Sequence, residues 1–221
     1  MKDDETIRRE IIATCNFMND KGINQGTSGN ISVRVDGGFL ITPSGVPYAE
    51  MQPDDIVFMK IDATHSGPRK PSTEWRFHRD IMEKKPEVGC TIHLHSMFCT
   101  TMSILRREIP AVHYMIAAVN GPTVPCVPYV TWGTQELADY IVDALKDRLA
   151  CLLANHGMVC IGPNLRRAAW LAVEVEALAA QYWRALQVGV PHVLPDAEIA
   201  NVMERFKSYG QGSEKRNPSC C

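Results

Sequence analysis

Apolar side chains recur with helical spacing over several stretches of the chain, and these stretches predict its helices. The first covers residues 5–20 and ends at Lys21-Gly22, where glycine suits a left-handed cap. Further helices are predicted over about 75–84, 96–105, 135–147, 165–188 and 196–209. In the helix over 165–188 we expect Glu174 and Glu176 to lie on the solvent-exposed face. The apolar stretch 109–119 fits either a helix or a strand.

Short apolar runs bounded by turn residues predict strands between these helices. They cover residues 31–35, 39–42, 56–61, 90–94, 149–153 and 158–161. Strands joined partly by hairpins, with helices before, between and after them, indicate an α/β or α+β fold. The economical arrangement is a central, mainly antiparallel or mixed sheet layered by helices. We expect a single domain over residues 1–210 and a flexible C-terminal tail over 211–221.

Composition and charge narrow the class of protein. The 221 residues are 45% apolar and 22% charged, which is typical of a soluble globular domain. A formal net charge of -2 provides no general attraction for nucleic acid or for a membrane surface. No apolar run approaches the ~20 residues of a membrane span, and no apolar signal segment follows the charged N-terminus. We therefore expect a cytoplasmic protein.

The eight cysteines do not form a disulfide or thiolate-metal pattern. Six of them are scattered singly through apolar segments without a CxxC pair, and the adjacent Cys220 and Cys221 end a polar tail. Isolated cysteines of this kind behave as small core side chains in a reducing compartment. We expect free thiols and no thiolate ligation of zinc.

The segment Thr91-Ile92-His93-Leu94-His95 carries the first indication of chemistry. On a strand, residues two apart point to the same face, so His93 and His95 project side by side. Two neutral imidazoles on one face are half of a zinc site, although two packed histidines would give the same pattern. Glu74 upstream and His156 downstream could complete the site. Three histidines with a carboxylate favour a catalytic ion, because structural zinc sites are usually rich in thiolates.

Three loops rich in glycine and hydroxyl side chains could hold a phosphate group. They cover residues 24–30, 43–45 and 71–74. Such loops present backbone N–H groups and hydroxyls to an anion, but ordinary turns have the same composition. Glu74 lies at the start of a predicted helix, where the helix dipole favours a carboxylate. His78 follows on the same helix face, where we expect a packing or surface role rather than metal ligation.

Seven short motifs occur in an order that resembles one known family. They are GTSGNISVR at 26–34, ITPSG at 41–45, PSTEWRFH at 71–78, HLH at 93–95, IPAVHYMIAA at 109–118, NHG at 155–157 and FKSYG at 206–210. On these motifs the chain resembles the class II aldolase/adducin family, and the resemblance covers essentially residues 5–210. The resemblance implies a fold of that kind and a homotetramer with active sites between subunits.

The resemblance also implies roles for individual residues. One Zn²⁺ per subunit would be held by Glu74, His93, His95 and His156. Phosphate and substrate contacts are implied for Thr27, Gly29, Asn30, Ser44, Gly45, Ser72 and Thr73. The implied catalytic residues are Glu74, Tyr114 and Tyr209, with Tyr114 contributed across a subunit interface.

The implied reaction is that of a metal-dependent aldehyde-lyase. A deoxyketose 1-phosphate of the L-fuculose 1-phosphate type would be cleaved reversibly to dihydroxyacetone phosphate and a short aldehyde such as lactaldehyde. The zinc ion would polarise the ketone, so that no Schiff-base lysine is needed. Glu74 would exchange the proton at C3, and Tyr114 would serve the oxygen on C4.

Several other enzymes and one non-catalytic module fit the same motifs, either less closely or equally well. Trp132 replaces a phenylalanine of a related aldolase, which keeps open a 5-deoxyribulose or 5-methylthioribulose 1-phosphate aldolase of nucleoside by-product salvage. A pentulose-phosphate 4-epimerase is disfavoured because aspartate is expected in place of Glu74. Related dehydratases and decarboxylases are disfavoured by Tyr114 and Tyr209. A non-catalytic adducin-like module is disfavoured because all three zinc histidines are present.

Overall fold

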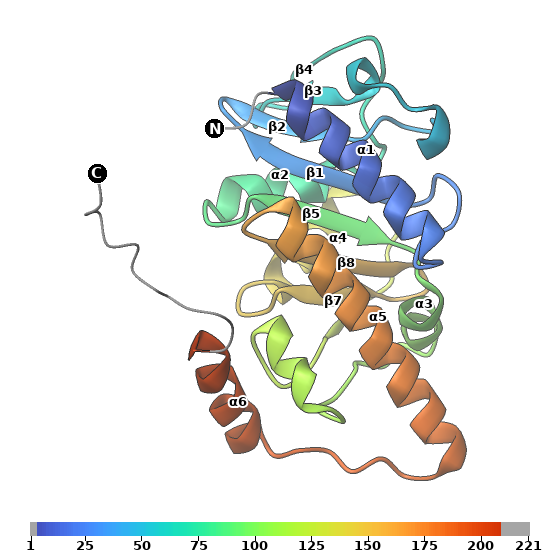
Figure 1. Ribbon diagram of the computed structural model, residues 1–221, viewed down its shortest axis with the longest axis vertical. Coiled ribbons are helices and arrows are strands. Elements are labelled where there is room, and N and C mark those ends of the chain that lie inside the picture. Colours follow the sequence, from blue (N-terminus) through green and yellow to red (C-terminus); the bar gives the residue numbers. More distant parts are fainter. Residues whose placement is uncertain (1–3, 209–221) are drawn as a thin grey trace, which may run out of the picture.

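The alternating apolar runs form one sheet in the computed structural model, which describes residues 4–208 (Figure 1). The strands follow the order β4-β3-β2-β1-β5-β8-β7-β6. Their bounds are β1 Asn30–Val35, β2 Gly38–Ile41, β3 Val57–Met59, β4 His65–Ser66, β5 Cys90–Leu94, β6 Cys126–Val127, β7 Ala150–Leu153 and β8 Gly157–Gly162. Neighbouring strands are antiparallel except β6 and β7, which are parallel. The expected mainly antiparallel, mixed sheet is confirmed.

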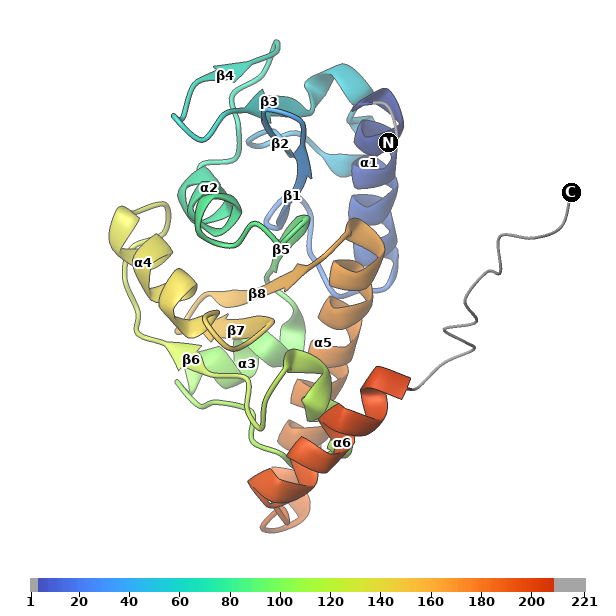
Figure 2. The same cartoon turned by 90° about the vertical axis from the view of Figure 1, so that its left-hand side faces the viewer.

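Helices cover both faces of this sheet, as the side view shows (Figure 2). The helices α1 (Asp4–Asp20) and α5 (Leu165–Val188) pack on one face, and α2 (Trp75–Lys84) and α4 (Gln135–Ala144) lie on the other. The helix α3 (Met97–Ile104) follows β5, and α6 (Asp196–Ser208) packs against the 3-10 helix η3 (Tyr114–Val119). Two short 3-10 helices, η1 (Tyr48–Glu50) and η2 (Pro53–Asp55), connect β2 to β3.

The alternation of side chains along the central strands separates two cores. Ile92 and Leu94 of β5 lie in the large core beneath α1 and α5. On β8, Val159 and Ile161 point the other way, into a second core with α2 and α4. His93 lies between Ile92 and Leu94 and therefore faces the α2 side, because neighbouring strand residues point to opposite faces. The same period sets Asn30 and Ser32 of β1 on the α2 face.

The structure differs from the predicted elements in three places. The two-residue edge strand β4, His65–Ser66, has no apolar run that would predict it. The two residues of β6 are too few for a periodic pattern and were not predicted. The undecided stretch 109–119 contains an isolated bridge from Ile109 to Val124, followed by η3.

Two further expectations concern cysteines and membrane association. The six cysteines among residues 4–208 are free thiols, and five of them are buried. No helix in that range is both long and apolar enough to cross a membrane. Tyr209, Cys220, Cys221 and the predicted tail lie outside the described residues.

Candidate metal centre and active site

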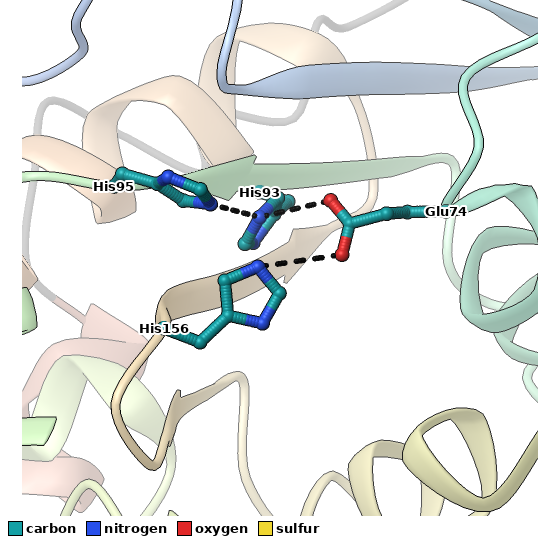
Figure 3. Close-up of side chains that lie close together, drawn as sticks. All are labelled: Glu74, His93, His95 and His156. Carbon is teal, nitrogen blue, oxygen red and sulfur yellow. Dashed lines mark hydrogen bonds and ion pairs between the residues drawn. The ribbon is translucent and has the colours of Figure 1, made fainter. Parts of the chain in front are cut away.

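Four side chains from three separate parts of the chain meet at one end of β5 (Figure 3). Glu74 immediately precedes α2, His93 lies in β5, His95 follows it, and His156 lies in the turn between β7 and β8. One ligand atom from each residue lies within 4.8 Å of all the others. Glu74 and His93 are buried, whereas His95 and His156 are half-buried. The structure thus brings together all four residues that the sequence singled out for a metal.

Glycine at position 157 permits the approach of the β7–β8 turn to β5. A Cβ atom at Gly157 would lie 2.3 Å from the carbonyl oxygen of Leu94 and 3.0 Å from Cδ2 of His95. No side chain fits at 2.3 Å from a backbone atom, so only glycine allows His156 to face His95 here. Asn155 helps to form the turn with a left-handed φ of 55°.

Three of the distances between ligand atoms lie close to those expected around a small tetrahedral cation. Nε2 of His93 lies 3.0 Å from Nε2 of His95 and 3.1 Å from Oε2 of Glu74. Oε1 of Glu74 lies 3.4 Å from Nε2 of His156. An ion about 2.0–2.2 Å from each ligand atom would place tetrahedral ligands about 3.4 Å apart.

Several nitrogen and oxygen atoms at the centre of this cluster have few hydrogen-bond donors facing them. Nδ1–H of His93 donates to the carbonyl oxygen of Met158 at 2.8 Å, so Nε2 is the ring nitrogen that faces His95 and Glu74. Burial opposes a charge on this ring, but the Glu74 carboxylate raises the pKa of His93, and a metal ion at Nε2 would take the place of that proton. Among the described residues, the buried Oε1 of Glu74 has no hydrogen-bond donor. Lone pairs of nitrogen and oxygen therefore converge on one point, which a divalent cation would satisfy.

Burial and mutual charge keep most of these imidazoles neutral. Burial, followed by the proximity of His93, lowers the pKa of His95 to about 4 and that of His156 to about 3. Burial alone would raise the pKa of Glu74, but His93, His156 and the Asn30 amide hold it well below its usual range. An ionised carboxylate and unprotonated imidazoles are the forms that ligate a metal.

A buried carboxylate on α5 anchors the chain directly after His95. Glu176, expected on a solvent-exposed face, is buried and accepts the Ser96 hydroxyl at 2.7 Å. It also accepts the N–H groups of Phe98 at 2.8 Å and Cys99 at 2.9 Å, at the N-terminus of α3. These N–H groups have no partner within their own helix, and Glu176 is buried because it caps α3 from another helix.

Two of the three polar loops form one wall of a cavity of about 490 Å³. The loops are joined because Ser44 N–H donates to Lys70 O at 3.1 Å and Ser72 N–H donates to Thr42 O at 3.0 Å. Ser44 and Thr73 line the cavity, and Gly45 is exposed beside Ser44. The wall thus ends one residue before Glu74.

An aromatic loop closes another side of this cavity. Trp132 and Gly133 line it, and Arg76 of α2 donates to the carbonyl oxygen of Gly133 at 2.7 Å. The indole of Trp132 is 59% exposed, so most of its surface is available to a ligand. Trp132 is thus positioned to contact whatever enters beside Ser44 and Thr73.

The third polar loop, before β1, is placed differently. Thr27 is exposed on that loop, whereas Gly29 is buried. A Cβ atom at Gly29 would lie 2.8 Å from the carbonyl oxygen of His93, so glycine lets this loop pass close to the metal-binding strand. The Asn30 amide donates to Oε2 of Glu74 at 3.0 Å. The side chain of Asn30 is therefore engaged with the predicted catalytic carboxylate.

His78 belongs to the site in a way that the sequence did not indicate. Its ring is fully buried, and its two nitrogens contact Ser32 Oγ at 2.7 Å and Asn30 Oδ1 at 2.5 Å. The apolar stripe of α2 could have indicated the burial of His78, because this residue lies with Phe77 and Ile81 on the buried face of the helix.

Of the two predicted catalytic tyrosines, Tyr114 lies within the part of the chain that the structure describes. Tyr114 begins η3, is half exposed, and stacks on the ring of His113 with centroids 4.7 Å apart. Tyr209 lies outside residues 4–208. An exposed Tyr114 is compatible with a role toward a neighbouring subunit.

Comparison with known proteins places this geometry in context. Residues 9–183 match the family model of the Class II Aldolase and Adducin N-terminal domain. The chain is 48% identical over 205 residues to the L-fuculose phosphate aldolase of Escherichia coli (strain K12), covering 92% of this chain and 95% of that protein. It is 46% identical over 212 residues to the 5-methylthioribulose-1-phosphate/5-deoxyribulose-1-phosphate aldolase of Rhodospirillum rubrum, covering 96% of each.

A solved structure described as L-fuculose 1-phosphate aldolase superposes with a TM-score of 0.89 and 37% sequence identity. The match covers 91% of this chain and 96% of that one. The expected fold and the expected class of enzyme, a class II aldolase, are confirmed by these likenesses. Since a family model covers most of the chain and relatives match it over almost their whole length, the chain belongs to the class II aldolase and adducin family.

Proposed function

We propose that this protein is a zinc-dependent aldolase that reversibly cleaves a deoxyketose 1-phosphate of the L-fuculose 1-phosphate type. The products would be dihydroxyacetone phosphate and a short aldehyde such as lactaldehyde. The observation that carries the proposal is the convergence of Glu74, His93, His95 and His156 one residue beyond the hydroxyl-lined wall of a cavity. Relatives named for this activity at 48% identity support the choice of substrate.

Three imidazoles and a carboxylate are a ligand set that suits zinc, and the half-buried His95 and His156 leave the site open on one side. When bound, the ion would polarise a substrate carbonyl and stabilise the negative charge that develops on its oxygen. The protein itself has to orient the substrate and move its protons.

Glu74 is the residue that we assign to the proton at C3. Its carboxylate is ionised, its Oε2 is held by the Asn30 amide, and its Oε1 is free of donors among the described residues. A buried carboxylate with one oxygen held and the other free can accept a proton at a defined place. Tyr114 would exchange the proton on the C4 oxygen across a subunit interface of a homotetramer, and Tyr209 would act in the same active site.

The phosphate group would lie against the loops of Ser44-Gly45 and Ser72-Thr73, with Thr27, Gly29 and the Asn30 backbone from the loop before β1. The exposed hydroxyls of Ser44 and Thr73 line the cavity, and such groups bind phosphate oxygens by donating hydrogen bonds. The cavity volume of about 490 Å³ is within the range for small-molecule sites.

A second substrate class has its own support. Trp132 contributes a large apolar surface to the same cavity, and a relative at 46% identity is named for 5-methylthioribulose 1-phosphate and 5-deoxyribulose 1-phosphate. An indole could accommodate the apolar end of a methylthio-aldehyde. The two classes share the cleavage chemistry and differ in the aldehyde that is released.

A coupled assay for dihydroxyacetone phosphate tests the proposal. We would measure kcat/KM for L-fuculose 1-phosphate, 5-deoxyribulose 1-phosphate and 5-methylthioribulose 1-phosphate with the same zinc-loaded preparation. We expect release from L-fuculose 1-phosphate with the highest kcat/KM; a higher value for either ribulose derivative would establish the second class. Absence of release from all three, with zinc bound, would overturn the aldolase and favour an epimerase.

A further inference from the structure

We propose that His78 is a positioning residue that fixes the Asn30 amide in the one orientation that can donate to Glu74. This inference rests on the proposed function, because it concerns how the carboxylate of that reaction is held. His78 lies four residues after Glu74, on α2, and its ring is linked to Glu74 by hydrogen bonds through Asn30.

The three residues form a continuous buried chain that ends at Glu74. Ser32 and Asn30 are two apart on β1 and point to the same face, where the imidazole of His78 bridges them. The Phe77 ring stacks on the His78 ring, with centroids 4.4 Å apart, and limits its rotation. Ser32, Asn30 and His78 are all buried, so water does not replace these hydrogen bonds.

Only one direction of hydrogen bonding satisfies every member of this chain. An ionised Glu74 accepts hydrogen bonds and never donates one, so Asn30 must turn its NH₂ group toward Oε2. Its carbonyl oxygen Oδ1 then faces His78 and requires a donor, which is Nε2–H. A neutral imidazole has a single N–H, so Nδ1 accepts the hydroxyl hydrogen of Ser32.

The opposite tautomer would disrupt the site. With Nδ1–H directed at Ser32, the bare Nε2 would accept from the Asn30 NH₂ group. The amide would be reversed, and its carbonyl oxygen would face the Glu74 carboxylate, acceptor against acceptor. Burial lowers the pKa of His78 to about 3, so the ring is neutral at pH 7 and its single N–H lies on either Nδ1 or Nε2.

The functional consequence is the orientation of one carboxylate. The Asn30 amide holds Oε2 and leaves Oε1 directed to the His156 side of the cluster. Without that donor the carboxylate can rotate, and the group that exchanges the C3 proton is no longer aligned. Misplacement of a reacting group by about 1 Å can cost ~100-fold in rate, and loss of a partner behind a metal ligand typically costs about 10–100-fold in metal affinity or activity.

The test compares His78→Leu, which removes both ring nitrogens, with His78→Gln, whose NH₂ group can still donate to Asn30. The matched control is Ile81→Val, which removes one methyl group from the same buried face of α2. At saturating zinc we expect His78→Leu to lower kcat about 30-fold with KM within about twofold, and to weaken zinc binding about 10-fold, as judged by competition with a chelator. We expect His78→Gln to recover most of both losses, and Ile81→Val to change neither.

A second readout is independent of activity and of the reaction. The ring ¹⁵N shifts of selectively labelled histidine report the tautomer of His78, which we expect to carry its proton on Nε2 in the zinc-free wild type. An Nδ1–H tautomer would overturn the inference, as would wild-type kcat in folded His78→Leu. If that variant does not fold, the tautomer and His78→Gln still decide. Failure of the wild type to cleave any substrate would refute the proposed function alone, because the tautomer readout needs no substrate.

Discussion

The carboxylate of Glu176, in the middle of α5, accepts the hydroxyl hydrogen of Ser96 at 2.7 Å, and Ser96 is the residue that follows His95. Through this contact the long helix fixes the end of the metal-binding strand. Glu176 also receives two backbone N–H groups of α3, so one buried side chain satisfies three donors.

Removing that carboxylate should loosen both α3 and the strand end. We expect Glu176→Ala to lower the free energy of unfolding by about 3 kcal/mol, since buried donors lose a charged acceptor. Zinc affinity should fall as well, because His95 is no longer anchored. Chemical denaturation and chelator competition measure the two effects, and the half-buried Glu174→Ala is the control. Equal stability of the two variants would refute this role.

The metal assignment predicts a joint loss of ion and activity. We expect His95→Ala to retain less than a tenth of the wild-type zinc content and to lose turnover with it, since one of four ligands is gone. His192→Ala removes an exposed histidine from the loop between α5 and α6 and should change neither. Atomic emission analysis of dialysed protein provides the zinc content. Full zinc content and normal turnover in His95→Ala would rule out the assignment.

The assignment of Glu74 to the C3 proton predicts a loss of proton exchange when its carboxylate is replaced. We expect Glu74→Gln to fold normally and to lower hydrogen exchange at C3 of dihydroxyacetone phosphate at least ~100-fold, because an amide cannot accept the proton. Proton exchange into the product, followed by NMR in deuterium oxide, measures this step without the aldehyde. Glu83→Gln, an exposed position on the same helix, serves as the control. Exchange at the wild-type rate in Glu74→Gln would assign the proton to another group.

The close approach at Gly157 predicts a steric effect on the site. A Cβ at this position would lie 2.3 Å from Leu94 O, whereas one at Gly189 would have open space around it. We expect Gly157→Ala to lower the free energy of unfolding by about 2 kcal/mol or more and to weaken zinc binding, since His156 is displaced. Gly189→Ala should be close to neutral. An unchanged zinc affinity in Gly157→Ala would show that the turn can shift without moving His156.

Acid sensitivity away from the metal is predicted for Asp55. The hydrogen bond from Arg69 at 2.7 Å, and the Gln52 N–H at 2.9 Å, hold the pKa of Asp55 below its usual value. Its stabilisation is therefore fully present above the unfolded pKa of about 3.9 and is lost as the pH falls through the lower folded pKa. In zinc-free protein we expect Asp55→Asn to cost about 1 kcal/mol at pH 7 and progressively less below pH 4. A cost that stays constant with pH, or an equal cost in the exposed Asp54→Asn, would contradict this.

The sequence predicts the parts of this protein that depend on local periodicity. We predict His93 and His95 on one strand face because strand geometry has a period of two. In the structure Ile92 and Leu94 face the opposite, apolar side. Contacts between distant segments have no such signal. Glu176 lies 80 residues from Ser96, and its position on a helix rich in alanine and charge gave no sign of burial.

Clusters of buried polar residues also have no signal in the sequence pattern. His78 has the helical spacing of the α2 core stripe, but a histidine there reads equally well as a surface residue. Its burial depends on Ser32 and Asn30 arriving on the same face from β1. The cavity beside Trp132 likewise depends on the Arg76–Gly133 contact, which joins residues 57 apart.

The most direct test of the metal-dependent aldolase is a zinc titration of metal-free protein, with release of dihydroxyacetone phosphate from the best substrate as the readout. The account predicts no release before zinc is added, a linear increase with each addition, and a plateau at one zinc per chain. The same titration of His95→Ala should give no increase up to that point. Full release from protein shown to be free of metal would contradict the account.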